Sequence, residues 1–272
     1  MNEIYGFDAF SPSEIADRIE NVGVKKANLP LLQMFMLGLL AGVFVGLGAM
    51  FNVIVLSDTN LSFAVSRVLG GLFFSMGLMM VLIAGAELFT GNNLLAMAWA
   101  DGKISIKQVL RNWIVVCFAN LIGGISLAVL VYLSGHTDMN HGAIATQYLN
   151  IASAKCSIPF REAFFSGILC NVLVCLAVWM AQAGRSVMDK VVVIILPVAA
   201  FVAAGFEHCV ANMYYIPMGL LLKDSHADIM NVDAITWLGF FNNLIPVILG
   251  NLVGGSVLVS LVYYLIYRKG VH

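Results

Sequence analysis

Long apolar runs follow one another along the chain and are separated by shorter polar stretches. A helix needs roughly 20 mostly apolar residues to cross the hydrocarbon core of a bilayer. Six runs reach that length, at about 31–56, 64–99, 112–134, 160–182, 191–222 and 241–267. The second and fifth runs are too long for one simple span and carry polar interruptions. The pattern predicts an all-α membrane protein with six transmembrane helices, the second and fifth of them interrupted.

The first thirty residues differ, because they are polar and amphipathic. Ser11-Pro12-Ser13-Glu14 is typical of a helix start, with a serine cap and an acidic first turn. The stretch lacks the short apolar core and small-residue cleavage site of a signal peptide. We expect residues 1–29 to form a cytoplasmic amphipathic helix at the membrane surface, and residues 30–272 to form the six-helix transmembrane domain.

Composition agrees with this prediction. Hydrophobic residues make up 61% of the chain and charged residues 11%, against about 25% charged residues in soluble domains. A large soluble protein is therefore excluded, and the lipid bilayer is the expected surrounding; no nucleic-acid partner is expected. The five cysteines form no CxxC pair, so we expect no disulfide framework, metal site or cofactor.

Lysine and arginine are distributed unevenly about the six runs, and this bias predicts orientation. With both termini in the cytoplasm, ten basic residues lie on that side and four on the other. The cytoplasmic set is Arg18, Lys25, Lys26, Lys103, Lys107, Arg111, Arg185, Lys190, Arg268 and Lys269, and the opposite set is Arg67, Lys155, Arg161 and Lys223. The intervening stretch 135–159, with His136 and His141, is expected to be a solvated loop.

Two motifs recur in corresponding spans. Asn120-Leu121-Ile122-Gly123-Gly124 in the third span matches Asn251-Leu252-Val253-Gly254-Gly255 in the sixth. Glu87 precedes Asn92 by five positions in the second span, as Glu207 precedes Asn212 in the fifth. Each half has an odd number of spans, so the halves have opposite orientations. We expect two inverted three-helix repeats, at about 30–134 and 160–267, with a substrate site near the midplane between them.

Both interrupted spans carry polar residues at a glycine. Gly205 precedes Glu207 and His208, and Gly85 precedes Glu87 within an otherwise apolar run. Ionisable groups at such depth are tolerated when they are paired or face water, and broken helices when protein or a cavity satisfies their backbone. Each break is expected to start a half-helix whose N-terminus points inward, which suits an anion.

The polar residues at the breaks receive different predicted roles. His208 is expected to act on the transported species, since imidazole changes protonation near neutral pH. Glu87 and Glu207, with Asn92 and Asn212, are expected to be structural, the acids accepting hydrogen bonds from freed N–H groups or neighbouring helices. A charged glutamate lining the pore would repel an anion. Glu207-His208-Cys209 is not expected to bind metal, because adjacent helical residues point in different directions.

Several segments resemble the formate–nitrite transporter family, and bacterial formate channels most. These segments are 23–27, 86–92, 171–180, 184–190, 205–213 and 243–246. The resemblance implies an aquaporin-like protomer, a homopentamer with one pore in each protomer, and a place in the bacterial inner membrane. By motif, His208 is the family's central histidine and Thr90 its hydrogen-bond partner. Further implied pathway residues are Leu78, Leu88 and Phe89 at a cytoplasmic-side constriction, Phe74 and Phe201 at an outer one, and Asn171 and Asn243 as nearby polar groups.

The predicted function is therefore a channel for a small monovalent anion, formate first, with proton transfer from His208. Nitrite and hydrosulfide stay open as alternatives on the same scaffold. A channel for neutral solutes would share the architecture, but the repeated Asn-Pro-Ala of aquaporins is absent. An intramembrane enzyme using Glu207 and His208 is disfavoured, because the chain has no HExxH or GxSxG motif.

Overall fold

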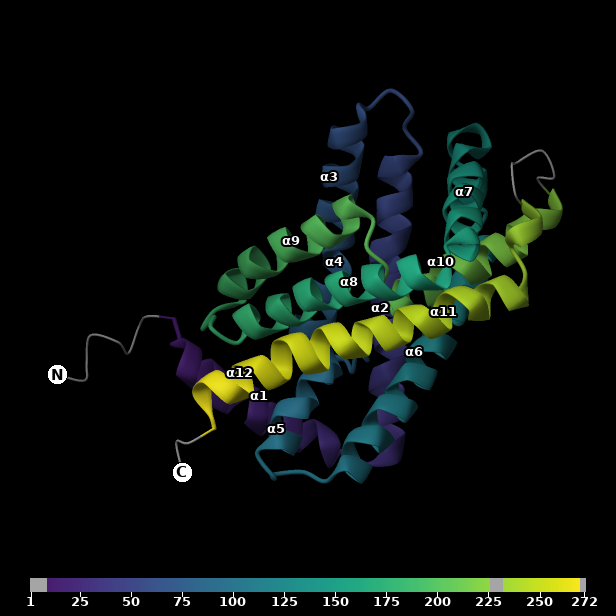
Figure 1. Cartoon of the computed structure of the whole chain (residues 1–272). Helices are drawn as coiled ribbons and strands as arrows, with labels where there is room; N and C mark the ends of the chain where they lie inside the picture. Colours follow the sequence, from purple (N-terminus) through teal and green to yellow (C-terminus); the bar gives the residue numbers. More distant parts are fainter. Residues whose placement is uncertain (1–8, 226–231, 270–272) are drawn as a thin grey trace.

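The computed structural model describes residues 9–225 and 232–269, and every regular element in those ranges is a helix (Figure 1). Six helices are long and apolar enough to cross a membrane: Leu31–Leu56, Phe63–Gly85, Ile106–Leu133, Phe160–Ala181, Val187–Ala204 and Trp237–Tyr267. The all-α, six-span prediction is confirmed, and so are the interruptions of the second and fifth spans. The protein is a multi-pass membrane protein.

The first repeat consists of three spans and one return segment. Its elements are α2 (Leu31–Leu56), α3 (Phe63–Phe74), α4 (Met76–Met79), a π-helical turn (Met80–Gly85), a 3-10 turn (Gly91–Leu94), α5 (Leu95–Ala100) and α6 (Ile106–Leu133). The second span is therefore α3, α4 and the π-helical turn in succession. The chain breaks after Gly85 and resumes as a helix only at Gly91.

The second repeat has the same order of spans. Its elements are α8 (Phe160–Ala181), α9 (Val187–Ala204), α10 (Cys209–Leu222), α11 (Trp237–Leu252), a π-helical segment (Val253–Leu261) and α12 (Val262–Tyr267). α10 has 14 residues, whereas its counterpart begins as the four-residue 3-10 turn and continues for six residues as α5. The two inward-pointing half-helices expected from the sequence are thus unequal, and the longer dipole lies in the second repeat.

Within each repeat the first and third spans pack closely through glycine. A Cβ added to Gly123 of α6 would lie 2.1 Å from the Leu39 carbonyl oxygen of α2. A Cβ added to Gly254 would lie 2.3 Å from the Ile168 carbonyl oxygen of α8. Only glycine allows backbones to approach this closely, so the repeated Asn-x-x-Gly-Gly motif is a packing motif in both halves.

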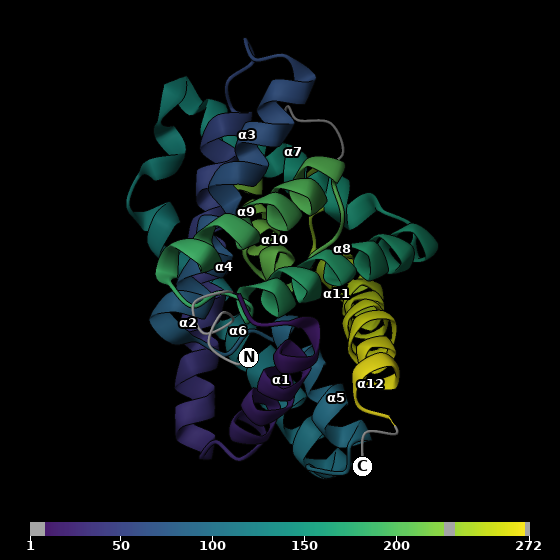
Figure 2. The ribbon, with the colours of Figure 1, turned by 90° about the vertical axis from the view of Figure 1, so that its left-hand side faces the viewer.

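α1 (Pro12–Ala27) lies against one end of the bundle, beside α5 and α12 (Figure 2). Its start is fixed by a capping box, in which the Ser11 hydroxyl accepts from the Glu14 N–H and Glu14 accepts from the Ser11 N–H. The fully buried Glu20 binds Lys103 and Arg268. Burial opposes the charge on Lys103, but hydrogen bonds to acidic partners raise its pKa overall. These pairs join α1 to the loop after α5 and to the end of α12.

The stretch between the repeats differs from the solvated loop that we expected. Residues Ala143–Ser157 form α7, and Tyr148, Leu149 and Ala152 on it are fully buried. Apolar residues recur there at helical spacing, and the helix packs against α10, where the Tyr148 and Tyr214 hydroxyls are 2.6 Å apart. His136 and His141 lie before α7 in short 3-10 turns.

Three spans begin four to six residues before the apolar runs that predicted them. α6, α9 and α11 start behind Ser105, Ser186 and Thr236, whose side chains accept hydrogen bonds from first-turn N–H groups. Side-chain caps satisfy the first N–H groups of a helix and so allow it to start in polar sequence.

Candidate functional site

The site is built around the two breaks. α9 ends at Gly205, which has a φ of +77°, and α10 begins at Cys209 with His208 as its cap residue. In the first repeat the span ends at Gly85, with a φ of +93°. Positive φ is strained for residues with a Cβ, so glycine lets each span stop abruptly inside the bundle.

Asn251 satisfies the backbone of the second break. Its Oδ1 accepts from the Cys209 N–H at 3.0 Å. Its Nδ2 donates to the Glu207 carbonyl at 3.0 Å and to the Gly167 carbonyl at 2.8 Å. One fully buried amide thus binds both sides of the break and ties it to α8.

Asn120 does the same in the first repeat. Its Oδ1 accepts from the Phe89 N–H at 2.9 Å, and its Nδ2 donates to the Glu87 carbonyl at 2.9 Å and the Gly38 carbonyl at 2.7 Å. The agreement of all three contacts supports the inverted symmetry. Sequence analysis identified both asparagines as repeat markers only, although their recurrence was the signal of this role.

Glu207 is held in a buried polar cluster on one side of the bundle. The Lys155 ammonium of α7 lies 2.8 Å from its Oε1. The Nδ2 atoms of Asn212 and Asn243 donate to its Oε2 at 2.7 and 3.2 Å. Asn243 also donates to the Lys155 carbonyl at 3.0 Å, so it belongs to this cluster.

Glu87 has the equivalent surroundings at the opposite side. Lys26 of α1 lies 3.0 Å from its Oε1, and Asn92 donates to its Oε2 at 2.7 Å. Asn112 accepts from Asn92 at 2.9 Å and donates to the Lys26 carbonyl at 3.3 Å. The donors to both acids are asparagines and lysines, whereas the freed Phe89 and Cys209 N–H groups donate to Asn120 and Asn251. Sequence analysis missed both lysines as partners, because it counted them only as charges at span ends.

His208 stands at the start of α10 with both ring nitrogens engaged. Its Nδ1 accepts from the Ala211 N–H at 3.1 Å, and its Nε2 lies 2.9 Å from the Thr90 hydroxyl oxygen. An acceptor at Nδ1 places the proton of the neutral ring on Nε2, which donates to Thr90. A second proton at Nδ1 would displace the hydrogen bond that caps α10, so this arrangement favours the neutral ring.

Asn171 holds the backbone of Thr90 through its side-chain amide. Its Nδ2 lies 3.3 Å from the Thr90 carbonyl, 2.7 Å from Asn93 Oδ1 and 2.7 Å from the Asn251 carbonyl. Neither Asn171 nor Asn243 is among the described residues that line the two cavities next to the breaks, which are described below. Both lie one layer behind the residues that do.

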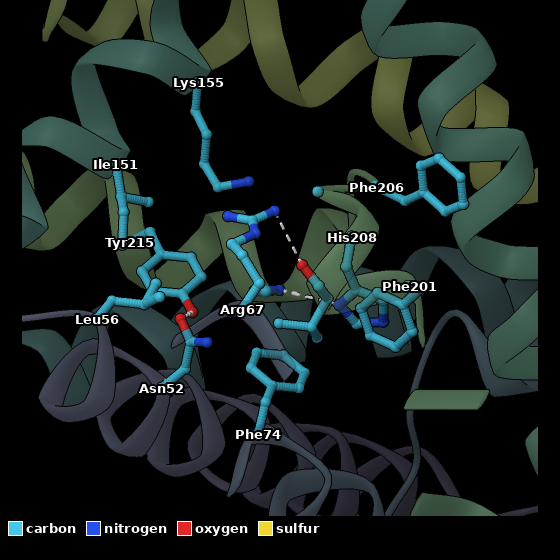
Figure 3. Close-up of a pocket in the computed structure, with 13 residues that line it drawn as sticks. Asn52, Leu56, Arg67, Phe74, Ile151, Lys155, Phe201, Phe206, His208 and Tyr215 are labelled. Carbon is cyan, nitrogen blue, oxygen red and sulfur yellow. Dashed lines mark hydrogen bonds between the residues drawn. The ribbon is translucent and has the colours of Figure 1, made fainter. Parts of the chain in front are cut away.

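One cavity opens on the side of the bundle away from α1, and we call it the distal vestibule (Figure 3). It is lined by Asn52, Leu56, Arg67, Phe74, Ile151, Lys155, Phe201, Val202, Gly205, Phe206, His208, Ala211 and Tyr215. The Phe201 ring stacks on His208 with centroids 5.8 Å apart, and the edge of Phe74 meets Phe201 at the same separation. The vestibule therefore ends on two phenylalanines and the histidine.

A second cavity, the proximal vestibule, lies beside α1. It is lined by Ile19, Val22, Gly23, Lys26, Leu78, Val81, Leu82, Leu88, Gly91, Asn92, Leu94, Leu95, Val178 and Gln182. Leu78 lies one helical turn from Phe74 of the distal vestibule. Phe89 is buried next to Leu88 and does not line this cavity. The two vestibules thus approach each other across a short, mostly apolar region that contains His208 and Thr90.

The repeats differ where the chemistry would occur. In the register that pairs Glu87 with Glu207, Leu88 stands at the position of His208. One break therefore presents an apolar side chain and the other an imidazole. Within the described residues no group of three His, Cys, Asp or Glu side chains is placed to hold a metal ion.

Comparison with known proteins agrees with this architecture. The formate/nitrite transporter family model matches residues 13–265. The chain is 40% identical to the formate channel FocA of Escherichia coli K12, over 97% of this chain and 96% of that one. It is 38% identical to the uncharacterized transporter YrhG of Bacillus subtilis, over 95% and 94%.

Two solved structures are similar over nearly their whole length. A pentameric formate channel with formate bound is 41% identical, with a TM-score of 0.79 over 88% of this chain and 98% of that one. A channel described as an FNT family ion channel is 30% identical, with a TM-score of 0.83 over 93% and 98%. The resemblance seen in the sequence is confirmed: this chain belongs to the formate/nitrite transporter family, whose named relatives are channels and transporters.

Proposed function

We propose that this protein conducts a small monovalent anion, formate first, through a pore that joins the two vestibules past His208. The observation that carries the proposal is the imidazole at the start of α10, placed between two cavities that each contain a basic side chain. The formate channel of Escherichia coli and the solved channel with formate bound support this substrate.

The apolar region between the vestibules sets the main barrier. A charged solute loses hydration there, and the free energy of that loss is large in apolar surroundings. Lysine and arginine side chains outside the pore mouths raise the local anion concentration, and the N-terminus of α10 favours negative charge at His208. The proposed constrictions are Phe74 and Phe201 on the distal side, and Leu78, Leu88 and Phe89 on the proximal side.

Proton transfer at His208 would lower this barrier. The neutral ring holds a single proton on Nε2 and is too weak an acid to give it to formate. The ring therefore first takes a proton from hydronium in the distal vestibule at Nδ1, which releases the Ala211 N–H, and becomes imidazolium. Transfer of that proton to formate yields formic acid and restores the neutral ring. Formic acid crosses the apolar constriction uncharged and releases the proton beyond it, so one proton and one formate move together.

The polar residues around the path have supporting roles in this proposal. Thr90 orients the His208 ring, and Asn171 and Asn243 stabilise the segments that carry the pathway residues. Glu87 and Glu207, with Asn92 and Asn212, neutralise the lysines and fix the two breaks. These acids contribute no net negative charge to the pore while they stay paired.

We further propose a homopentamer in the bacterial inner membrane with both termini in the cytoplasm. The description of the similar structure as pentameric supports the assembly. The excess of lysine and arginine on the side of the termini supports the orientation. In this arrangement residues 1–29 carry a helix on the cytoplasmic side of the channel domain 30–272; residues 1–8, 226–231 and 270–272 lie outside the described residues.

The test is a flux assay in proteoliposomes that contain a pH-sensitive dye. Formate, nitrite and hydrosulfide are offered in turn, with empty liposomes as the control for passive leak. We expect formate to move fastest and to carry protons, and the His208→Asn variant to lose the pH change. If nitrite or hydrosulfide moves fast while formate moves slowly, that anion replaces formate as the proposed substrate. Full proton-coupled flux in His208→Asn would refute the role of the histidine.

A further inference from the structure

Arg67 reaches from α3 across the distal vestibule to the break in the fifth span. Its Nε donates to the Ala203 carbonyl at 2.9 Å and its Nη2 to the Val202 carbonyl at 3.1 Å. A Cβ added to Gly205 would lie 2.8 Å from Nη2. The guanidinium is therefore fixed at the C-terminal end of α9, immediately before the segment that leads to His208.

The charge of Arg67 has no acidic counterpart among the described residues. Lys155, the other cation of the distal vestibule, lies 2.8 Å from the Glu207 carboxylate. Within the described ranges Arg67 makes its hydrogen bonds to neutral carbonyl groups only, and the cavity lining described there contains no Asp or Glu. Figure 3 shows the guanidinium below the Lys155 ammonium, between Tyr215 and His208. The distal vestibule thus holds one positive charge that is not neutralised.

The proximal vestibule lacks this excess charge. Its described lining contains one cation, Lys26, which lies 3.0 Å from the Glu87 carboxylate. The repeats place equivalent Lys–Glu pairs at the two vestibules, and Arg67 has no equivalent in the proximal lining. The two mouths of an otherwise symmetrical pore therefore differ by one charge.

We propose that Arg67 is the anion-capturing group of the distal vestibule. It binds a small carboxylate before that anion meets Phe74 and Phe201, and it makes the pore half-saturate at a lower concentration from the distal side than from the proximal side. Arginine suits this role because its planar guanidinium keeps donors available after two are used on a helix end. The inference rests on the proposed anion function and adds a sided binding step to it.

The experiment compares labelled formate uptake in right-side-out and inside-out membrane vesicles, at equal pH on both sides. We expect Arg67→Gln to raise the half-saturation concentration from the distal side by roughly tenfold or more, since a hydrogen bond to a charged group contributes about 1.5–3 kcal/mol and about 1.4 kcal/mol is a factor of ten. The value from the other side should stay unchanged. Arg67→Lys keeps the charge and should stay near the parent protein. Arg161→Gln removes an equal charge from an exposed position outside the cavity and should change neither side.

The outcomes separate the possible causes. An Arg67→Gln variant with unchanged half-saturation from both sides overturns the inference. Equal rises in Arg67→Gln and Arg67→Lys also overturn it, because the arginine would then act only through the α9 carbonyls. If Arg67→Gln does not fold, raising the concentration of an impermeant salt with the parent protein must weaken capture on one side only, since salt screens exposed charges. A parent protein whose formate uptake shows no saturation from the distal side overturns the capture step, whereas a parent protein without formate uptake above that of control vesicles overturns the proposed function itself.

Discussion

The buried side-chain amide of Asn251, which holds the second break together, predicts a measurable loss of stability when it is removed. Replacing Asn251 with alanine removes three buried hydrogen bonds, to the Cys209 N–H and to the Glu207 and Gly167 carbonyls. Each contributes about 1 kcal/mol to the free energy of unfolding. We therefore expect a loss of about 3 kcal/mol, which corresponds to a fall in melting temperature of roughly 6–12 °C for a chain of this size.

A matched control lies on the same span. The fully buried Ser260 hydroxyl donates one hydrogen bond, to the Leu94 carbonyl at 3.1 Å. Ser260→Ala should lower the melting temperature by roughly 2–4 °C. Asn120→Ala should match Asn251→Ala in stability, because it removes the equivalent three bonds from the first repeat.

The assay is thermal unfolding of the purified protein in detergent, followed by formate flux in proteoliposomes. Flux should fall more in Asn251→Ala than in Asn120→Ala, because only the second break carries His208. If Asn251→Ala melts no lower than Ser260→Ala, the amide does not hold the break and this reasoning is refuted.

Three further perturbations test other contacts. Lys155→Met leaves Glu207 buried without its cation and should destabilise the protein by about 3–5 kcal/mol; the double variant Lys155→Met/Glu207→Gln should recover most of that loss in the same melting assay. Thr90→Val removes the buried partner of the imidazole Nε2 and should lower formate flux roughly tenfold, as expected for about 1.4 kcal/mol of lost transition-state stabilisation, whereas its melting temperature should fall only by roughly 2–4 °C, as in Ser260→Ala. Hydrogen bonds to the serine cap lower the pKa of Glu14 from its ordinary value of 4.5, so its contribution to the stability of α1 is present above that value and is lost as pH falls through the lower folded pKa. The protection of first-turn amides of α1 against hydrogen exchange, taken relative to their intrinsic exchange rate at each pH, should therefore fall in acid, and Glu14→Gln should remove that pH dependence.

The spans could be predicted because a bilayer demands long apolar runs. Their starts could not, since polar caps such as Ser105 and Ser186 extend the helices beyond those runs. α7 was missed for a different reason. Its apolar positions, Ile144, Tyr148 and Ala152 among them, have helical spacing but lie among polar residues, and only the packed neighbour α10 explains their burial.

The candidate site was partly visible in the sequence. The breaks follow from glycine beside an acid in an apolar run, and the pairing of Thr90 with His208 came from family resemblance. The lysine partners of the two acids could not be predicted from the sequence, because Lys26 and Lys155 lie 61 and 52 positions from the acids that they neutralise. Nothing local distinguishes a lysine that turns inward from one that faces the lipid headgroups.

The two buried Lys–Glu pairs have a consequence for biosynthesis. In both repeats the lysine precedes its glutamate along the chain, Lys26 before Glu87 and Lys155 before Glu207. During co-translational insertion, a lone carboxylate entering the bilayer is unfavourable by about 2.5–3.5 kcal/mol. Because each lysine has already been synthesised when its acid emerges from the ribosome, each carboxylate can be neutralised as its span enters the membrane. The order of residues along the polypeptide thus allows each glutamate to pair with its lysine while its span is being inserted into the membrane.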